Sequence, residues 1–257
     1  MSAGGLPAAP GGGHAGADPV PVLSAGVETA AMRDEPVLLV HGFATSAART
    51  WRDNGWIDLL GDVGRAVIAP DLLGHGQSDK PHDPEAYGAL ESGVAAHLPD
   101  RPVDAVGFSL GARVVLTLAA DDPGRFSRIV VAGVGANLFR DDGASDVIAG
   151  AVAGDGDPAN PVVQYFAGLA AQPGVDRTAL AACIRCRRPR LDAAVLGKIT
   201  CPVLVVLGDR DFAGPAEPLV EGLPNATFVP LRGVDHFATP KDFGFLDAAL
   251  GFVDAQP

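Results

Sequence analysis

A serine between two glycines carries the strongest chemical signal in the sequence. Gly107, Ser109 and Gly111 form a Gly-x-Ser-x-Gly motif that follows an apolar run and precedes a helical pattern. On such a tight turn a serine takes up a strained backbone conformation that exposes its hydroxyl, and the glycines let strand and helix approach closely. The motif alone also fits a simple glycine-rich turn, but its position between strand and helix predicts a nucleophile at Ser109.

A serine hydroxyl is a weak nucleophile, so it needs a base, and a third group must orient that base. His236 lies in a loop after the last predicted strand, whereas the other histidines lie in the N-terminal tail, in turns or in segments that suggest solvent exposure. Two carboxylates, Asp209 and Asp211, directly follow the predicted strand 203–207. We therefore predict His236 as the base and one of the two aspartates as its partner.

A second turn offers backbone hydrogen-bond donors to the same cleft. Phe43 follows His41 and Gly42 directly after an apolar run. The turn can aim the Phe43 N–H at the cleft, and together with the N–H of Leu110 it would form a two-donor oxyanion hole. The helix that starts after Ser109 would also favour developing negative charge. We interpret His41 as a residue that hydrogen-bonds the turn, not as a catalytic group.

The elements that must position these residues alternate along the chain. Short apolar runs predict strands, and longer segments between them have helical character. This alternation predicts the α/β class: a mostly parallel central sheet with helices on both faces. The predicted strands are Val37–Val40, Ala66–Ala69, Val103–Val106, Ile129–Val131, Val203–Leu207 and Ala226–Val229, and the predicted helices lie near Ala47–Leu60, Pro84–Leu98, Leu110–Asp121 and Phe243–Val253.

The segment from about 135 to 200 interrupts this rhythm, because it contains no strand candidate. It has short helical stretches at Pro161–Ala171 and Asp176–Arg188. Since ligands of open parallel sheets bind outside the carboxyl ends of the strands, we predict a small helical cap inserted between the strands near 129–132 and 203–207. Its apolar residues fit a pocket lining or core packing, and its arginines fit an acidic substrate or a solvated face: Val147, Ile148, Val162, Val163, Phe166 and Leu169, and Arg185, Arg187, Arg188 and Arg190.

Composition sets the wider limits. Residues 1–19 are almost wholly Gly, Ala and Pro, which predicts a disordered tail before one domain at 20–257. The net charge of −12 argues against nucleic acid and anionic membranes as partners. No basic residue precedes Arg33 and no apolar run approaches the roughly 20 residues that span a bilayer, so we expect a soluble, cytoplasmic protein. The sequence makes no prediction of an oligomeric state.

The three cysteines argue against a disulfide framework. Cys183 and Cys186 form a Cys-x-x-Cys motif, but no second pair and no nearby histidine accompany it. We therefore predict no metal site, and we interpret the two thiols as residues on one face of an arginine-rich helix without a catalytic role.

Five segments together resemble the α/β-hydrolase fold family, in its serine esterase, lipase and C–C hydrolase branch. In that family the acid stands third after the turn glycine, which implies Asp211; the alternative is that Asp209 works and Asp211 only caps a helix. Asp71, His75 and Ser78 resemble residues that hold a loop beside the active site. The matching segments occur in order over most of residues 35–240: LLVHGF at 38–43, PDLLGHGQSDKP at 70–81, VGFSLGA at 106–112, PVLVVLGDRD at 202–211 and GVDHF at 233–237.

The resemblance implies a hydrolase without a cofactor, in which Ser109 attacks, His236 is the base, Asp211 orients it, and the Phe43 and Leu110 N–H groups bind the oxyanion. Serine at the nucleophile position disfavours the dehalogenases and epoxide hydrolases of this fold, which use aspartate. The expected substrate is a small carboxylic ester of short to medium chain length; thioesters, lactones and C–C bonds are alternatives. A non-enzymatic small-ligand receptor on the same fold is a rival, and the intact set of candidates argues against a degenerate, purely structural domain.

Overall fold

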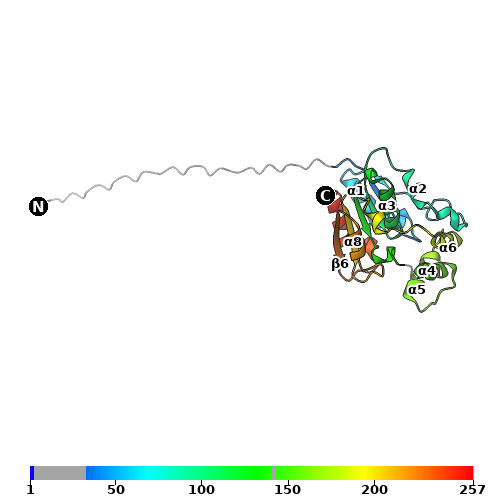
Figure 1. Cartoon of the computed structure of the whole chain (residues 1–257). Coiled ribbons are helices and arrows are strands. Elements are labelled where there is room, and N and C mark those ends of the chain that lie inside the picture. Colours follow the sequence, from blue (N-terminus) through cyan, green and yellow to red (C-terminus); the bar gives the residue numbers. More distant parts are fainter. Residues whose placement is uncertain (3–32, 141–142, 257) are drawn as a thin grey trace. The chain divides into compact units, whose positions relative to one another are not determined.

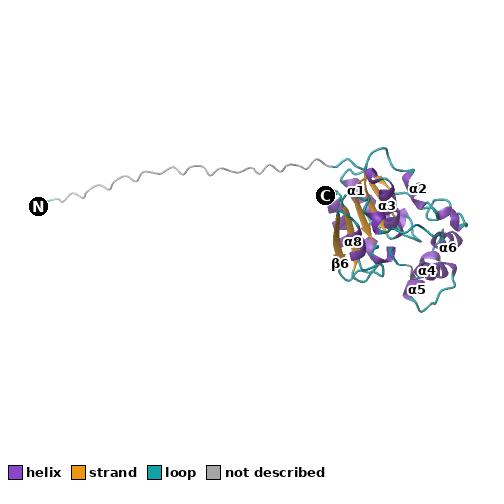
Figure 2. Ribbon diagram, viewed as in Figure 1, coloured by secondary structure: helices purple, strands orange, loops and turns teal. Residues whose placement is uncertain are grey.

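The computed structural model describes residues 1–2, 33–140 and 143–256. The described residues from 33 onward contain a six-stranded parallel sheet (Figure 2). The predicted fold class is confirmed. Apart from its first two residues, the predicted tail at 1–19 lies outside the described residues, as does the predicted domain start at 20. In the sheet order β2-β1-β3-β4-β5-β6, the strands are β1 Val37–Val40, β2 Val67–Ile68, β3 Val103–Phe108, β4 Phe126–Ala132, β5 Val203–Gly208 and β6 Ala226–Leu231.

Helices and short helical turns connect these strands (Figure 1). The helices are α1 Trp56–Asp62, α2 Leu90–Ala95, α3 Leu110–Asp121, α4 Ala144–Ala153, α5 Pro161–Ala170, α6 Arg177–Arg185, α7 Ala193–Leu196, α8 Glu217–Gly222 and α9 Phe243–Phe252. The short helical turns are η1 Ala48–Arg52, η2 Pro84–Tyr87, η3 Pro123–Arg125, η4 Ala136–Leu138 and η5 Thr239–Lys241.

The side chains of each strand alternate between two apolar clusters, one on either face of the sheet. In β1, Leu38 belongs to the cluster that contains the buried residues of α3. The next residue, Leu39, belongs to the cluster with Trp56 of α1 and Phe245 of α9. Successive strand residues point to opposite faces of the sheet, and each of the two clusters contains residues from helices. Helices therefore cover both faces.

The predicted helix at Ala47–Leu60 is wrong as a single element. It divides into η1 and α1 at Gly55, whose φ of 81° lies in the left-handed region. The Asn54 amide donates hydrogen bonds to the carbonyls of Arg49 and Thr50 at 3.2 and 3.0 Å. These side-chain bonds satisfy carbonyls at the end of η1, so the chain can turn without continuing the helix.

Two further differences from the predicted helices have local causes. The predicted helix at 84–98 is divided into η2 and α2, because Ala89 leaves helical geometry with φ −134° and ψ 57°. The sequence analysis missed α8, because a segment of six residues with Pro218 and Gly222 has little helical pattern. By contrast, α3 has the predicted bounds.

Helices α4 to α7 lie between β4 and β5, which confirms the predicted helical insertion. Helix α4 packs against both α5 and α6 (Figure 1). Side-chain caps start three of these helices: Asn160 accepts a hydrogen bond from the Val162 N–H, Asp176 accepts from the Thr178 and Ala179 N–H groups, and Asp192 accepts from the Val195 N–H. Helix α4 was not named in the sequence analysis, because its Ala- and Gly-rich sequence has little periodic pattern.

A buried ion pair lies near the start of β3, at the end of the strand opposite Ser109. Arg65 is 4% exposed, and its Nη2 lies 2.6 Å from Asp104 Oδ2. The same guanidinium donates to the carbonyls of Glu35 and Val253. It therefore neutralises a fully buried carboxylate and joins β3 to segments from both ends of the described domain.

Replacement of this arginine should be costly. Arg65→Met leaves the Asp104 carboxylate without its closest ion-pair partner and two carbonyls without their donor, so we expect the free energy of unfolding to fall by about 3–5 kcal/mol in urea denaturation. The matched control is Arg101→Met, because Arg101 pairs with Asp34 on the surface. Its replacement should lower the free energy of unfolding by about 1 kcal/mol or less. Equal losses for the two variants would contradict this assignment.

Candidate active site

The predicted nucleophile lies in the turn between β3 and α3. The backbone of Ser109 has φ 53° and ψ −113°, a conformation that residues other than glycine rarely adopt. A Cβ atom at Gly107 would lie 2.7 Å from Ala112 Cα, and one at Gly111 would lie 2.1 Å from the Val40 carbonyl oxygen. Both positions therefore require glycine, and the tight turn that they permit exposes the Ser109 hydroxyl at the carboxyl end of the sheet.

Three predicted side chains meet there in one hydrogen-bonded series. His236 Nε2 lies 3.0 Å from Ser109 Oγ, and His236 Nδ1 lies 3.0 Å from both carboxylate oxygens of Asp211. Because a carboxylate only accepts hydrogen bonds, Nδ1 carries the ring proton and Nε2 is left to accept one from Ser109. His236 and Asp211 are buried, which keeps water from competing for these bonds.

The two aspartates after β5 do different things. Asp211 contacts His236, and its Oδ1 also accepts a hydrogen bond from the Ala213 N–H at 2.8 Å. Asp209 is exposed and accepts a hydrogen bond from the Gly233 N–H at 2.8 Å. The geometry thus joins Asp211 to the imidazole, whereas Asp209 fastens the loop after β5 to the loop that carries the histidine.

The imidazole ring of His236 is enclosed by aromatic rings. The Phe108 and Phe212 ring centroids lie 5.0 and 4.4 Å from its own. A Cβ atom at Gly133, just after β4, would lie 3.0 Å from His236 Cε1 and 2.7 Å from Phe108. Gly133 therefore leaves the space that the ring occupies, and sequence reasoning missed it because only the folded chain brings β4 next to the histidine loop.

His41 holds the turn that contains Phe43. Its Nδ1 lies 2.7 Å from the Gly42 carbonyl oxygen, and its Nε2 accepts a hydrogen bond from the Leu72 N–H at 3.0 Å. Burial lowers the pKa of His41, so the ring is neutral and serves as one donor and one acceptor. In the described part of the chain, the N–H of Phe43 has no acceptor, and the N–H of Leu110 opens α3, where a helix leaves its donors unpaired.

Asp71 organises the neighbouring loop. Its two carboxylate oxygens accept hydrogen bonds from the N–H groups of Ala47 and Gln77, both at 2.8 Å, and its carbonyl accepts from the Ser78 hydroxyl. His75 is buried in the same loop, and burial lowers its pKa to about 3. Asp71, His75 and Ser78 therefore hold this loop beside the site, and none of them hydrogen-bonds Ser109 or His236.

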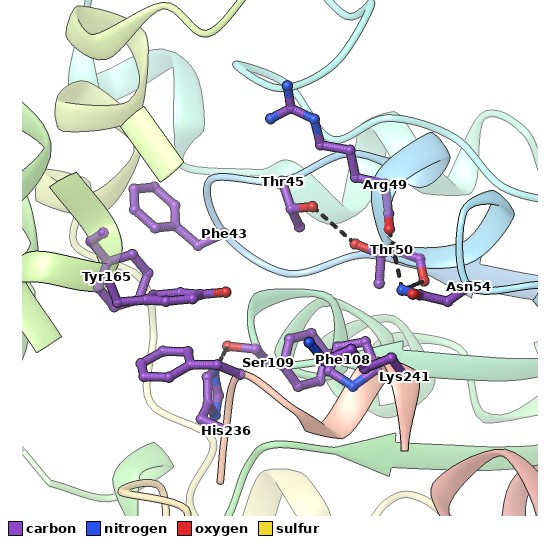
Figure 3. A pocket seen from close by; sticks show the side chains of 13 residues that line it. Phe43, Thr45, Arg49, Thr50, Asn54, Phe108, Ser109, Tyr165, His236 and Lys241 are labelled. Carbon is purple, nitrogen blue, oxygen red and sulfur yellow. Dashed lines mark hydrogen bonds between the residues drawn. The ribbon is translucent and has the colours of Figure 1, made fainter. Parts of the chain in front are cut away.

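A cavity of about 120 Å³ lies beside Ser109 and His236 (Figure 3). Aromatic rings from the β1 turn, β3, the cap and the histidine loop form its apolar side. Phe43 and Phe166 were predicted from the sequence to lie near the site and the other rings were not, although the position of Phe237 directly after His236 is a usable signal. The rings belong to Phe43, Phe108, Tyr165, Phe166 and Phe237.

The opposite side of the cavity is polar. The hydroxyl oxygens of Thr45 and Thr50 lie 3.1 Å apart, and Arg49 and Lys241 add two cations. No acidic side chain of the described residues lines this cavity, although the chain carries a net charge of −12. The cavity can therefore accept a polar or anionic group next to an apolar one.

The predicted cap features lie away from this cavity, with one exception. Phe166 lines it, but none of the four cap arginines does; Arg188 instead donates to the Cys183 carbonyl at 2.9 Å. Burial raises the pKa of the Cys183 thiol to about 11, whereas Cys186 is half-buried. Among the described residues, no three His, Cys, Asp or Glu side chains come close enough to bind a metal ion, and none of the helices could cross a bilayer.

Comparisons with known proteins agree with the fold. The family model described as alpha/beta hydrolase fold matches residues 35–153. The 2-hydroxy-6-oxo-2,4-heptadienoate hydrolase of Pseudomonas putida is 34% identical over 137 residues, which are 49% of this chain and 48% of that protein. The pimeloyl-[acyl-carrier protein] methyl ester esterase of Neisseria meningitidis is 32% identical over 173 residues, 58% of this chain and 66% of that protein. The chain thus spans less than two thirds of the length of these curated relatives.

Solved structures extend the match over most of the chain. The bromoperoxidase from Bacillus anthracis has a TM-score of 0.62 at 23% identity and covers 86% of this chain and 92% of that one. This chain has the α/β-hydrolase fold. In this fold, the Ser109, His236 and Asp211 side chains occupy the carboxyl edge of the sheet, where ligands of such sheets bind.

Substitution of each aspartate after β5 would distinguish their roles. Asp211→Ala should lower kcat/KM for nitrophenyl acetate by about 10³- to 10⁴-fold, because the imidazole loses the carboxylate that orients it. Asp209→Ala should lower it by about tenfold or less, since only a loop contact is lost. A larger loss for Asp209→Ala than for Asp211→Ala would show that Asp209, and not Asp211, orients the imidazole.

Proposed function

We propose that this protein is a serine hydrolase that cleaves a carboxylic ester of a small molecule. The series of hydrogen bonds from Ser109 through His236 to Asp211 carries the proposal. A hydroxyl joined to an imidazole that is itself held by a carboxylate is the arrangement that activates serine for attack on a carbonyl.

The first step would form an acyl-enzyme. Ser109 Oγ attacks the substrate carbonyl while His236 Nε2 takes the hydroxyl proton, and Asp211 stabilises the imidazolium. The N–H groups of Phe43 and Leu110 bind the oxyanion, each worth about 3–4 kcal/mol of transition-state stabilisation. When the C–O bond breaks, the leaving oxygen takes the proton from His236.

The second step would release the acid by the same route. Water loses a proton to His236 Nε2 as it attacks the acyl-enzyme, and the tetrahedral intermediate again places its oxyanion at the two N–H groups. Collapse returns the proton to Ser109 Oγ and frees the carboxylic acid. These side chains hold every proton that moves, so no step calls for a metal or an organic cofactor.

Hydrolysis of a carbon–carbon bond is the second candidate, and the polar side of the cavity favours it. Lys241 offers a cation to a substrate carboxylate, and Arg49, whose Nη2 donates to the Pro173 carbonyl, adds positive charge at the rim of the cavity. The Pseudomonas putida relative is named as a hydrolase of a hydroxy-oxo-dienoate, a compound of that kind. The same serine and histidine would serve both reactions, so the substrate decides between them.

The nucleophile can be tested by labelling. The wild type should hydrolyse nitrophenyl butyrate and gain the mass of one fluorophosphonate adduct, and Ser109→Ala should lose both properties while it keeps the wild-type urea unfolding curve. Intact-protein mass spectrometry and a spectrophotometric assay measure the two effects. A folded wild type with neither turnover nor adduct would favour a non-enzymatic ligand receptor.

The size of the cavity predicts the chain length of the substrate. About 120 Å³ is small for a ligand pocket, so kcat/KM should be highest for acetyl and butyryl esters and about tenfold lower for the dodecanoyl ester. The panel should include a 2-hydroxy-6-oxo-2,4-dienoate, which we expect to react more slowly than the short esters. Faster turnover of the long ester would contradict the chain length expected from the cavity volume. Faster turnover of the dienoate would favour carbon–carbon bond hydrolysis over ester hydrolysis.

A further inference from the structure

The cap places one aromatic residue directly against the histidine loop. The ring of Tyr165, in α5, stacks on the ring of Phe237 with a centroid distance of 3.4 Å and an angle of 23° between their planes. Phe237 directly follows His236 in the chain. The stack therefore ties the position of the Tyr165 ring to the loop that carries the imidazole.

A second contact fixes the same ring from the cap side. Phe166 is buried and lies edge-on to Tyr165, with a distance of 5.4 Å between the ring centroids. Its ring centroid also lies 5.8 Å from that of Phe43. With one aromatic neighbour stacked on its face and another at its edge, the Tyr165 ring has little freedom to rotate. Its hydroxyl is consequently aimed in a defined direction.

That direction is into the cavity beside the serine. Figure 3 shows the Tyr165 hydroxyl pointing away from the cap, toward Ser109. Tyr87, the other tyrosine of the chain, donates its hydroxyl hydrogen bond to the Pro81 carbonyl at 2.6 Å. The Tyr165 hydroxyl, in contrast, has no hydrogen-bond partner among the described residues, so it is free to donate a hydrogen bond to a substrate atom in the cavity.

The hydroxyl also stays protonated. Burial, and to a smaller degree the nearby Asp235 carboxylate, raise the pKa of Tyr165 above its ordinary value. A phenol that does not ionise in the neutral range is a hydrogen-bond donor throughout that range.

The stack also indicates which substrate atom the hydroxyl meets. The oxyanion would be bound by the N–H groups of Phe43 and Leu110, whereas the leaving oxygen must face His236 Nε2, which returns the proton to it. Tyr165 packs on Phe237, the residue that follows His236 in the chain, so its ring belongs to the wall of the cavity formed with the histidine loop.

We propose that Tyr165 is a substrate-binding residue whose hydroxyl donates a hydrogen bond to the leaving-group oxygen of the ester. This inference rests on the serine hydrolase function proposed above. As the C–O bond of the tetrahedral intermediate breaks, its electron pair goes to the leaving oxygen, which takes the proton held by His236. Tyr165 keeps its own proton and stabilises the developing charge through the hydrogen bond.

The test is Tyr165→Phe, because phenylalanine keeps the aromatic stack and removes only the hydroxyl. We expect kcat/KM for the ethyl ester of a short acid to fall by about tenfold to a hundredfold. For the ethyl thioester of the same acid the loss should be about threefold or less, because sulfur is a weak acceptor. The matched control is Tyr87→Phe, which removes a hydroxyl outside the cavity and should leave the ratio of ester to thioester activity unchanged.

Two outcomes would overturn the inference. Equal losses on ester and thioester would place the hydroxyl at the oxyanion or in the packing of the cap, and no loss on either would show that it does not contact the substrate. A urea unfolding curve for each variant separates these results from a folding defect. If the wild type hydrolyses neither substrate, the proposed function itself has failed; an active wild type with an unaffected Tyr165→Phe variant removes only this inference.

Discussion

The His236 imidazole must reach two side chains from two other loops at once, and the surrounding structure serves that requirement. Ser109 follows β3, Asp211 follows β5 and His236 follows β6. Because all six strands are parallel, these loops emerge at the same edge of the sheet. Contacts of 3.0 Å at each ring nitrogen then align His236 with Asp211, 25 positions before it in the chain, and with Ser109, 127 positions before it.

Close backbone approach is what makes this alignment possible. Gly107 and Gly111 let β3, α3 and β1 come within a distance that any Cβ atom would prevent, and Gly133 leaves room for the imidazole. The buried pair of Arg65 and Asp104 lies at the other end of β3, away from the reactive side chains. Stability of the sheet and chemistry of the site therefore depend on separate groups at opposite ends of one strand.

Local signals predicted the sheet and the reactive side chains. Each described strand coincides with an apolar run, and the glycines around Ser109 follow from the sterics of the turn. The choice between Asp209 and Asp211 needed the family resemblance, because both follow β5 at almost the same place. Tyr165 could not be predicted, since its position depends on how α5 packs against the loop after β6, and no local pattern encodes that contact.

The bond from the Gly233 N–H to Asp209 gives the site a property beyond its static geometry. It joins the acid loop to the histidine loop before any ligand arrives. The conformational entropy needed to align the two loops is thus lost once, when the chain folds, and not again each time a ligand binds. In the proposed ester hydrolysis, substrate binding energy would then remain available for distorting the ester toward its tetrahedral form.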